Sequence, residues 1–312
     1  MPMNPELLAN PKAERIRRVA ELANAKARRR TGHFLVEGPQ SVREAVACCP
    51  DSVRDLYVQA NDAADAGNGR TAGQDDSAHT AASVRSRIVE TALEAGIYVH
   101  EAMPEVMSRI SSNTQGIAAV VETERLLANG GSVSWPDGAD DTRDAGDAGS
   151  TMIAAFWQVR DPGNAGTVIR SADAAGCAAV VFVDDCVDVF NPKVVRSTAG
   201  SLFHVPVLSM ETEEFFAWMS GHGCPVIAAD IYGTAENRPQ SLPRLLRDGS
   251  LGIAAKAVLF GNEARGLPEE ILAQAQRIVS IPIYGKAESL NLATSAAVML
   301  FSMAMSSHIG TM

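Results

Sequence analysis

The sequence has 312 residues, of which 46% are hydrophobic and 21% charged, and its formal net charge is −10 at pH 7. This length and apolar content exclude a disordered chain and predict about two domains with packed cores. An uninterrupted apolar run of about eighteen residues and a basic-then-apolar N-terminal segment are both missing, so we expect no membrane span, no signal peptide and a cytoplasmic location.

The cysteines and histidines show no ligand pattern. The five cysteines are odd in number, and none of them occurs in a Cys-x-x-Cys or a Cys/His metal spacing. The six histidines are scattered along the chain. We therefore expect reduced thiols, with neither a disulfide framework nor a metal site.

A basic segment opens the chain. Residues 11–30 contain eight Lys or Arg against two Glu, in a protein that is acidic as a whole. Such a cluster neutralises phosphates without reading base sequence, although a solvated helix face would have the same composition. We favour RNA contact, because most of the acidic excess falls in two other segments, residues 60–82 and 129–150. The predicted RNA-binding residues are Lys12, Arg15, Arg18, Lys26, Arg28, Arg29 and Arg30.

Short strands and helices alternate through the first third of the chain. Strands are expected at residues 33–36, 53–58, 97–100 and 116–121, and helices at 38–48, 84–95 and 105–111. This alternation predicts a compact α/β domain over residues 1–125. Residues 60–82, rich in Ala, Asp, Gly and Asn, are predicted to be a disordered insertion in it. The acidic, Gly- and Asp-rich residues 126–151 are predicted to be an interdomain linker.

Residues 152–312 form the second predicted domain. Apolar strands are expected at 153–159, 179–183, 205–208, 226–229, 257–260 and 277–281, with helices between them. That order is typical of a mostly parallel sheet covered on both faces. A final helix over 291–306 carries small or apolar residues on one side, suited to close core packing, at Ala293, Ala296, Ala297, Leu300 and Ala304.

Three strand-to-helix turns in this domain are rich in glycine, asparagine and charge: residues 160–176, 259–268 and 281–292. Each turn taken alone is explained by helix capping, since Ser and Asn accept hydrogen bonds from free backbone N–H groups. Together they have the composition of the carboxyl edge of a parallel sheet, where ligands bind. We therefore expect one shared pocket.

These turns resemble the three motifs of the SpoU/TrmH family of RNA ribose 2′-O-methyltransferases, in the SPOUT superfamily. The matching stretches are Asn164 to Arg170, Gly261-Asn262-Glu263 with Gly266-Leu267, and Ile281-Pro282 with Ser289-Leu290-Asn291. The resemblance covers residues 152–306, and residues 34–38 resemble the L30e-like substrate-binding domain of that family. Ala264 stands where the family often has Gly, a small departure because Glu263 and Gly266 are kept.

The resemblance implies an α/β-knot fold with a deep trefoil knot, S-adenosylmethionine as cofactor, no metal, and a homodimer formed through the knotted domain. It assigns the cofactor pocket to Gly261, Asn262, Ile281, Leu290 and Leu292. It assigns catalytic roles to Arg170, Asn164, Glu263, Ser289 and Asn291. Independently of the family, Gly261 would let the backbone approach a ligand closely. Glu263 could also be a carboxylate that interacts favourably with a helix N-terminus.

Arg170 is the residue to which the family gives the ribose proton. A guanidinium has a pKa above about 12 and stays protonated in proteins. We therefore expect Arg170 to hold the ribose or its phosphate and to stabilise negative charge developing on oxygen, with full base behaviour only if the site depresses its pKa.

The sequence thus predicts an RNA 2′-O-methyltransferase, with 23S ribosomal RNA preferred because of the L30e-like domain. A transfer-RNA 2′-O-methyltransferase and a non-catalytic RNA-binding protein on the same fold remain alternatives. A nucleotide-dependent oxidoreductase is disfavoured, because no Gly-x-Gly-x-x-Gly turn is present. No membrane partner is expected.

Overall fold

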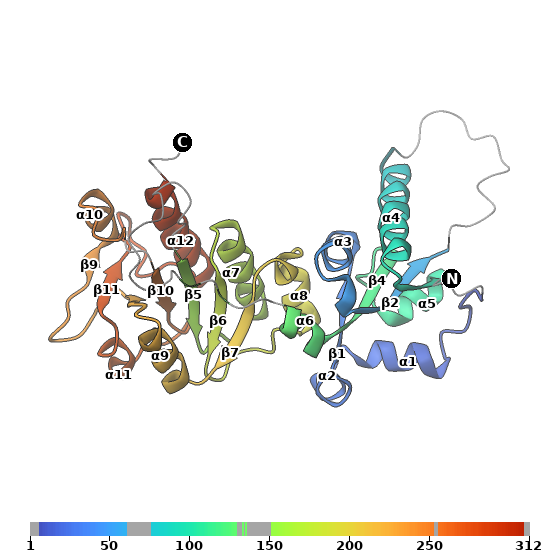
Figure 1. Cartoon of the computed structure of the whole chain (residues 1–312), viewed down its shortest axis with the longest axis horizontal. Coiled ribbons are helices and arrows are strands. Elements are labelled where there is room, and N and C mark those ends of the chain that lie inside the picture. The colour runs from blue at the N-terminus through green and yellow to red at the C-terminus, as the bar shows by residue number, and fades with distance from the viewer. Residues whose placement is uncertain are drawn as a thin grey trace. The chain divides into compact units, whose positions relative to one another are not determined.

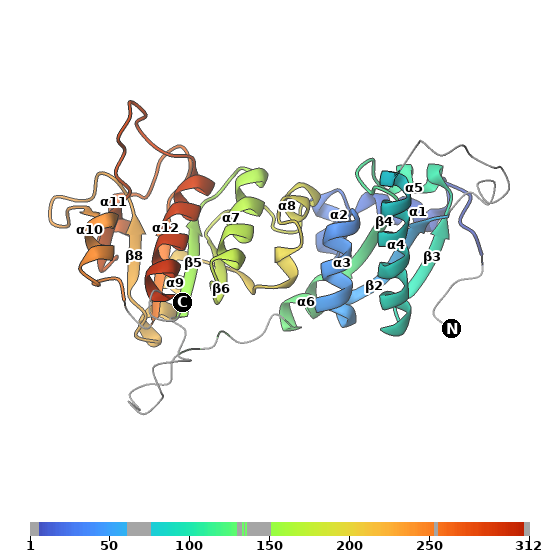
Figure 2. The ribbon, with the colours of Figure 1, turned by 90° about the horizontal axis from the view of Figure 1, so that it is seen from above.

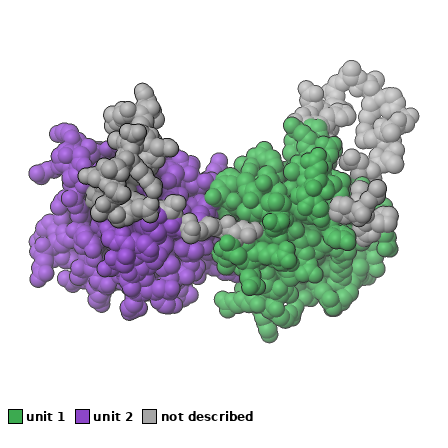
Figure 3. All heavy atoms as spheres, viewed as in Figure 1, with its two compact units in different colours: residues 1–129, 190–204 green, residues 130–189, 205–312 purple. Residues whose placement is uncertain are grey.

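The computed structural model describes residues 6–60, 76–129, 133, 135, 151–252 and 255–308. Its contacts divide the chain into two compact units (Figure 3). Unit 1 comprises Met1–Asn129 and Phe190–His204, and unit 2 comprises Gly130–Val189 and Val205–Met312. Across the described ranges, every helix is too short or too polar to cross a membrane.

Unit 1 is built on a four-stranded sheet with the order β1-β4-β2-β3. β4 (Ile117–Glu122) pairs antiparallel with β1 (His33–Glu37) and with β2 (Val53–Gln59). β3 (Tyr98–Ala102) runs parallel to β2. Helices α1 (Glu14–Glu21) and α5 (Pro104–Ile110) bury their apolar residues against one face of the sheet. Helices α3 (Pro39–Cys48) and α4 (Asp76–Glu94) pack on each other and on the sheet (Figure 2).

The elements expected in this region are all present, with two differences. Helix α4 begins at Asp76, so the end of the predicted insertion at 60–82 is helical, while residues 61–75 lie outside the described part of the chain. Helix α6 (Thr123–Asn129) runs into the predicted linker, and most of the remaining linker lies outside the described residues. The basic segment forms α1 and α2 (Ala25–Thr31), and a 3-10 turn, η1 (Pro50–Ser52), precedes β2.

Residues 190–204 lie within the predicted second domain in sequence but pack within unit 1. They form α8 (Pro192–Ser197) and the 3-10 turn η3 (Ser201–Phe203). The Phe190 ring lies against Phe34, with 4.7 Å between centroids. Arg196 Nη1 donates to Glu37 Oε2 at 2.9 Å, and the Glu37 side chain is only 4% exposed. A buried carboxylate that has a cationic partner holds this segment on β1.

Unit 2 is built on a seven-stranded sheet with the order β7-β6-β5-β10-β8-β11-β9, in which every pairing is parallel. This sheet confirms the predicted fold class. The predicted strands appear as β5 (Thr151–Trp157), β6 (Ala179–Val183), β7 (Val207–Met210), β8 (Val226–Ala229), β10 (Ala255–Phe260) and β11 (Arg277–Ser280). The edge strand β9 (Gln240–Ser241) was not predicted, because two residues carry no recognisable periodicity.

Helices cover both faces of this sheet (Figure 1). α9 (Thr212–Gly221) and α11 (Glu269–Leu272) share a core with alternate residues of β5, β6, β8 and β10. α7 (Pro162–Ala174) and α12 (Leu292–His308) lie side by side on the other face, and α10 (Leu242–Arg247) contacts α12. Every residue of β6 is buried, which explains why that strand is continuously apolar. Ala296 and Leu300 of α12 are fully buried, as expected for core packing.

Candidate functional site

Hydrogen bonds join the three predicted turns of unit 2. Asn164, in the first turn of α7, donates from Nδ2 to Glu263 Oε1 at 3.1 Å. Asn291, just before α12, donates from Nδ2 to Asn164 Oδ1 at 3.1 Å. The turns that follow β5, β10 and β11 therefore meet through one chain of three side chains. The two hydrogen bonds join residues that are 99 positions apart (Asn164 and Glu263) and 127 positions apart (Asn164 and Asn291) in the sequence.

The direction of each hydrogen bond in this chain follows from the helix starts. Asn291 Oδ1 accepts from the backbone N–H groups of Ala293 at 2.8 Å and Thr294 at 3.3 Å, so its Nδ2 must face Asn164. Asn164 then presents Oδ1 to Asn291 and Nδ2 to Glu263. The amide orientations are thus fixed by donors that cannot be reversed.

Glu263 is the acceptor at the end of the chain. Besides Asn164, its carboxylate accepts from the backbone N–H of Asp161 at 3.3 Å and of Arg160 at 3.5 Å. Asp161 in turn caps α7, its Oδ1 accepting from Asn164 N at 2.8 Å. The alternative interpretation of Glu263 as a carboxylate acting on its own helix start is therefore incomplete. Its hydrogen-bond partners lie on the β5–α7 turn.

The turn after β10 is closed by its own polar groups. Asn262 donates from Nδ2 to the Gln158 carbonyl at 2.7 Å and accepts from Ala264 N at 2.9 Å. Asn262 and Gly266 also exchange backbone hydrogen bonds of 3.2 and 2.9 Å. A Cβ atom on Gly261 would lie 2.4 Å from the Gly266 carbonyl carbon. Only glycine fits there, because real Cβ atoms do not approach backbone that closely.

A cavity of about 500 Å³ opens beside these turns. Its lining includes all five predicted cofactor residues, together with two predicted catalytic residues: Gly261, Asn262, Ile281, Leu290, Leu292, Glu263 and Ser289. Phe260, Leu267, Val279 and Met299 supply apolar walls. A cavity of this volume, with apolar walls and several polar groups, is suited to a small organic ligand.

The remaining predicted catalytic residues do not line the cavity. Asn164 and Asn291 are connected to it through Glu263. Arg170 lies further along α7, is exposed, and makes no hydrogen bond or ion pair with other described residues. A free cation therefore stands on the helix that the hydrogen-bond chain anchors.

Sequence reasoning missed one wall of the cavity, the loop at residues 230–235 after β8. Asp230 Oδ1 accepts from the backbone N–H groups of Tyr232 and Gly233, both at 2.7 Å, and so shapes this loop. The available signal was an Asp-x-x-Gly turn directly after a predicted strand. The loop presents Ile231 and Tyr232, two exposed apolar side chains.

Cys186 lies near the site and could be considered as a nucleophile. Its sulfur accepts from the backbone N–H of Val159 at 3.2 Å. Burial raises the pKa of this thiol to about 11, despite that hydrogen bond. The thiol stays protonated at neutral pH, which argues against covalent catalysis by cysteine.

The predicted RNA-binding residues lie in unit 1 and separate into two groups. Lys12, Arg18, Lys26, Arg29 and Arg30 are exposed. Arg28 corrects the prediction: it is 6% exposed, and its Nη1 donates to the carbonyls of Leu22 and Ala23, both at 2.8 Å. Those bonds tie the start of α2 to the end of α1, so Arg28 is structural.

Arg15 is engaged in a polar cluster on the unit 1 sheet. It donates to Asp55 Oδ1 at 2.8 Å and to the Tyr57 hydroxyl at 3.1 Å, and His100 Nε2 lies 2.8 Å from the same Asp55 oxygen. Burial raises the pKa of the Asp55 carboxyl, but the His100 hydrogen bond and the Arg15 charge outweigh burial and hold it below its ordinary value. Arg18, Arg54 and Tyr98 line the same groove, of about 1220 Å³.

The sequence matches two family models. Residues 151–301 match the SpoU rRNA Methylase family, and residues 13–119 match the MRM3-like substrate binding domain. Among curated proteins, the chain is 28% identical over 297 residues to the 23S rRNA (guanosine(2553)-2′-O)-methyltransferase RlmP of Bacillus subtilis, covering 94% of this chain and 97% of that protein. It is 29% identical to the 23S rRNA (guanosine-2′-O-)-methyltransferase RlmB of Xylella fastidiosa, covering 71% of this chain and 84% of that protein.

Among solved structures, the AdoMet-bound rRNA methyltransferase from Sinorhizobium meliloti superposes with a TM-score of 0.70. It covers 98% of both chains at 24% sequence identity. At that identity the likeness establishes the fold of the whole chain.

Gly261→Ala tests the close packing of the β10 turn. We expect a loss of about 2 kcal/mol or more in unfolding free energy, because the new methyl group meets backbone that cannot rotate away. Gly285→Ala is the matched control, since a Cβ there meets no atom within 4 Å. Urea unfolding of both variants measures the difference. Equal stabilities would contradict the packing argument.

Proposed function

The chain belongs to the SpoU rRNA methylase family, and from this premise we propose that it methylates a ribose 2′-hydroxyl of 23S ribosomal RNA, with S-adenosylmethionine as donor. The methylase domain supports the reaction class. The named activities of the RlmP and RlmB relatives support the RNA. The MRM3-like domain supports a substrate-binding role for unit 1. With ribosomal RNA as the proposed substrate, we propose the cytoplasm as the place of action.

The cavity of unit 2 is the proposed cofactor site. S-adenosylmethionine bound there would supply a methyl group activated by its sulfonium charge. Gly261 lets the β10 turn close on itself beside the cavity, and the main chain of Ile281, Leu290 and Leu292 offers hydrogen-bonding groups between apolar walls. Asn262 shapes the turn, and Ser289 adds a hydroxyl to the lining. None of these contacts requires a metal.

Arg170 is the proposed contact to the reacting ribose. Glu263, Asn164 and Asn291 act as positioning residues, because their hydrogen bonds hold the start of α7 against the β10 and β11 turns. An exposed guanidinium on that helix can bind a ribose oxygen or the adjoining phosphate. In the transition state it would stabilise negative charge on the 2′-oxygen, which is electrostatic catalysis, and the hydroxyl proton would pass to solvent water.

The deciding experiment measures transfer of labelled methyl from S-adenosylmethionine to 23S rRNA that lacks the modification, followed by mapping of the labelled ribose. We expect label at one ribose in the wild type. In Arg170→Ala we expect the rate of methyl transfer to fall by a factor of about 100 or more, with unchanged cofactor affinity. Arg247→Ala, an exposed arginine on α10, is the control and should keep full rate.

Label confined to transfer RNA would show that transfer RNA, and not 23S ribosomal RNA, is the substrate. Cofactor binding without label in any RNA would contradict the proposed activity, and no cofactor binding at all would favour a non-catalytic RNA-binding protein. S-adenosylhomocysteine should raise the melting temperature of wild type and Arg170→Ala alike, by simple linkage.

The exposed cations of α1 and α2 are the proposed RNA contacts of unit 1. Replacing Arg18, Arg29 and Arg30 together by Gln should lower the slope of log affinity against log salt concentration by about 0.7 to 0.9 per lost phosphate contact. Filter binding to rRNA fragments measures that slope. Arg109→Gln on α5 is the control. An unchanged slope in the triple variant would remove this surface from the RNA interface.

The exposed face of α12 is the proposed homodimer contact. Val298, Phe301 and Met305 follow one another at helical spacing and are 39%, 37% and 55% exposed. Exposed apolar residues on one side of a helix mark a contact surface. Phe301→Glu should convert a dimer to a monomer in sedimentation velocity, and Leu127→Glu on α6 should not. A monomeric wild type would contradict the dimer.

A further inference from the structure

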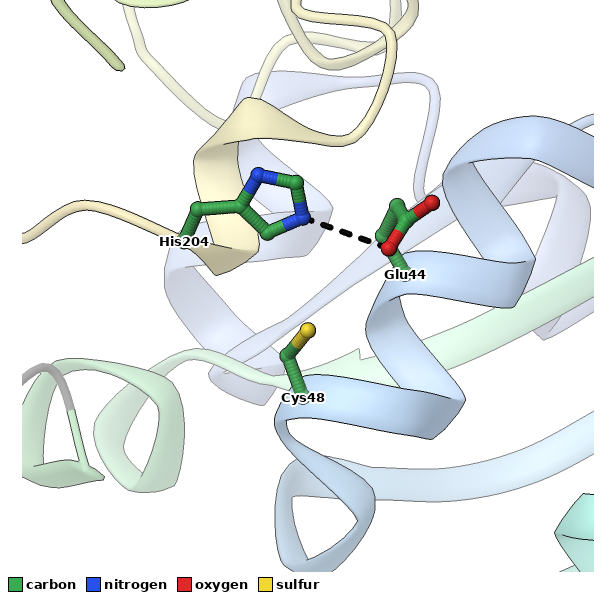
Figure 4. A group of neighbouring side chains, drawn as sticks. All are labelled: Glu44, Cys48 and His204. Carbon is green, nitrogen blue, oxygen red and sulfur yellow. Dashed lines mark hydrogen bonds and ion pairs between the residues drawn. The ribbon is translucent and has the colours of Figure 1, made fainter. Parts of the chain in front are cut away.

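Three side chains of metal-binding type converge in unit 1, and none of them lines the cofactor cavity. Glu44 and Cys48 are one turn apart on α3, so both project from the same side of that helix. His204 follows η3, 160 residues after Glu44. The carboxylate oxygen, the sulfur and the imidazole nitrogen all lie within 4.8 Å of one another. Figure 4 shows the ring of His204 directed at the Glu44 carboxylate, with the Cys48 sulfur facing the pair.

The distances match the edges of a small coordination tetrahedron. His204 Nε2 and Glu44 Oε2 are 3.3 Å apart. Ligands at about 2.0 to 2.1 Å from Zn²⁺, held at the tetrahedral angle, are separated by about 3.3 to 3.5 Å. A thiolate sulfur about 2.3 Å from the same ion would lie about 3.6 Å from the nitrogen and the oxygen. A rotation of the exposed Cys48 side chain can bring its sulfur to that separation. The nitrogen and oxygen already have the required separation.

The backbone around these residues is held firmly. The Cys49 thiol donates to the Phe203 carbonyl, with 3.6 Å from sulfur to oxygen, directly beside His204. Gly200, at φ +106°, passes so close to α3 that a Cβ atom there would lie 2.4 Å from Glu44 Cγ. The Phe34–Phe190 contact and the Arg196–Glu37 ion pair anchor the start of the same segment. His204 is therefore placed opposite Glu44 by packing on both sides.

The charges suit a divalent ion. Glu44 carries a negative charge, which its ion pair with Arg43 partly offsets, and a Cys48 thiolate would add a second negative charge that favours a 2+ cation. Arg43 Nε donates to Glu44 Oε1 at 2.9 Å, which orients the carboxylate and leaves Oε2 facing His204. On binding, Cys48 would release its thiol proton to solvent, and Nε2 of His204 would bind through its lone pair.

We propose that Glu44, Cys48 and His204 form a binding site for a transition-metal ion of the Zn²⁺ class, with water in the fourth position. The mixed nitrogen, sulfur and oxygen donor set favours zinc over magnesium or calcium. Bound metal fastens residues 200–204 to α3 and so fixes an excursion of the chain onto unit 1. It takes no part in the proposed methyl transfer.

The test is metal binding by the full-length, metal-free protein. We expect one Zn²⁺ per chain by calorimetry, and a Co²⁺ derivative with a sulfur-to-cobalt charge-transfer band and the intense visible bands of four-coordinate cobalt. Glu44→Gln, Cys48→Ser and His204→Gln should each weaken Zn²⁺ affinity tenfold or more. His222→Gln, an exposed histidine in unit 2, is the matched control and should bind like the wild type. Zn²⁺ should raise the melting temperature only where the three ligands are intact.

Two results would overturn the site. Equal affinities of Glu44→Gln, His204→Gln and wild type would mean that Cys48 binds metal alone, as any exposed thiol does. A wild-type cobalt spectrum without the charge-transfer band would exclude the thiolate whatever the folding of the variants. Both readouts are independent of RNA and of S-adenosylmethionine, so their outcome does not depend on the proposed methyltransferase activity.

Discussion

The hydrogen-bond chain from Glu263 through Asn164 to Asn291 is the constraint on which the candidate site depends. Parallel strands bring their carboxyl ends to one edge of the sheet, but that alone would leave three independent turns. Here the carboxylate of Glu263, in the turn after β10, accepts hydrogen bonds from the turn after β5. The backbone N–H groups at the start of α12 fix the amide orientation of Asn291 and, through it, that of Asn164. Reversing either amide would set N–H against N–H and lose hydrogen bonds of this chain. The three turns therefore keep a single arrangement beside the cavity.

The basic segment shows how one local composition serves two purposes. Arg28 uses its charge inside the fold, donating to carbonyls at the end of α1, and Arg15 is held by Asp55 and Tyr57. Burying a guanidinium is costly unless its donors are satisfied, and the donors of the buried Arg28 are satisfied by carbonyls that only the folded chain supplies. The other cations of the segment remain exposed. An acidic protein can thus offer phosphates a positive surface.

Residues 190–204, which leave unit 2 and pack in unit 1, add three side-chain contacts that residues 1–129 could not make by themselves. They supply an aromatic partner for Phe34, a cation for the buried Glu37, and a histidine opposite Glu44 and Cys48. The chain leaves β6 for this unit and returns at β7, so the two units are connected by more than the linker. Only Val205 and Pro206 separate this segment from β7 in the sequence.

The sequence by itself determined the alternation of strands and helices, the mostly parallel second sheet and the three polar turns, two of which line the cavity. These are local patterns: apolar periodicity, glycine at close approaches, and capping residues before helices. Only the tertiary structure decided that Arg28 is buried, that the loop 230–235 closes the cavity, that 190–204 packs in unit 1, and that His204 meets Glu44 and Cys48. Each of these depends on residues far apart in the chain. Local periodicity records which face of an element is buried but not which distant segment buries it.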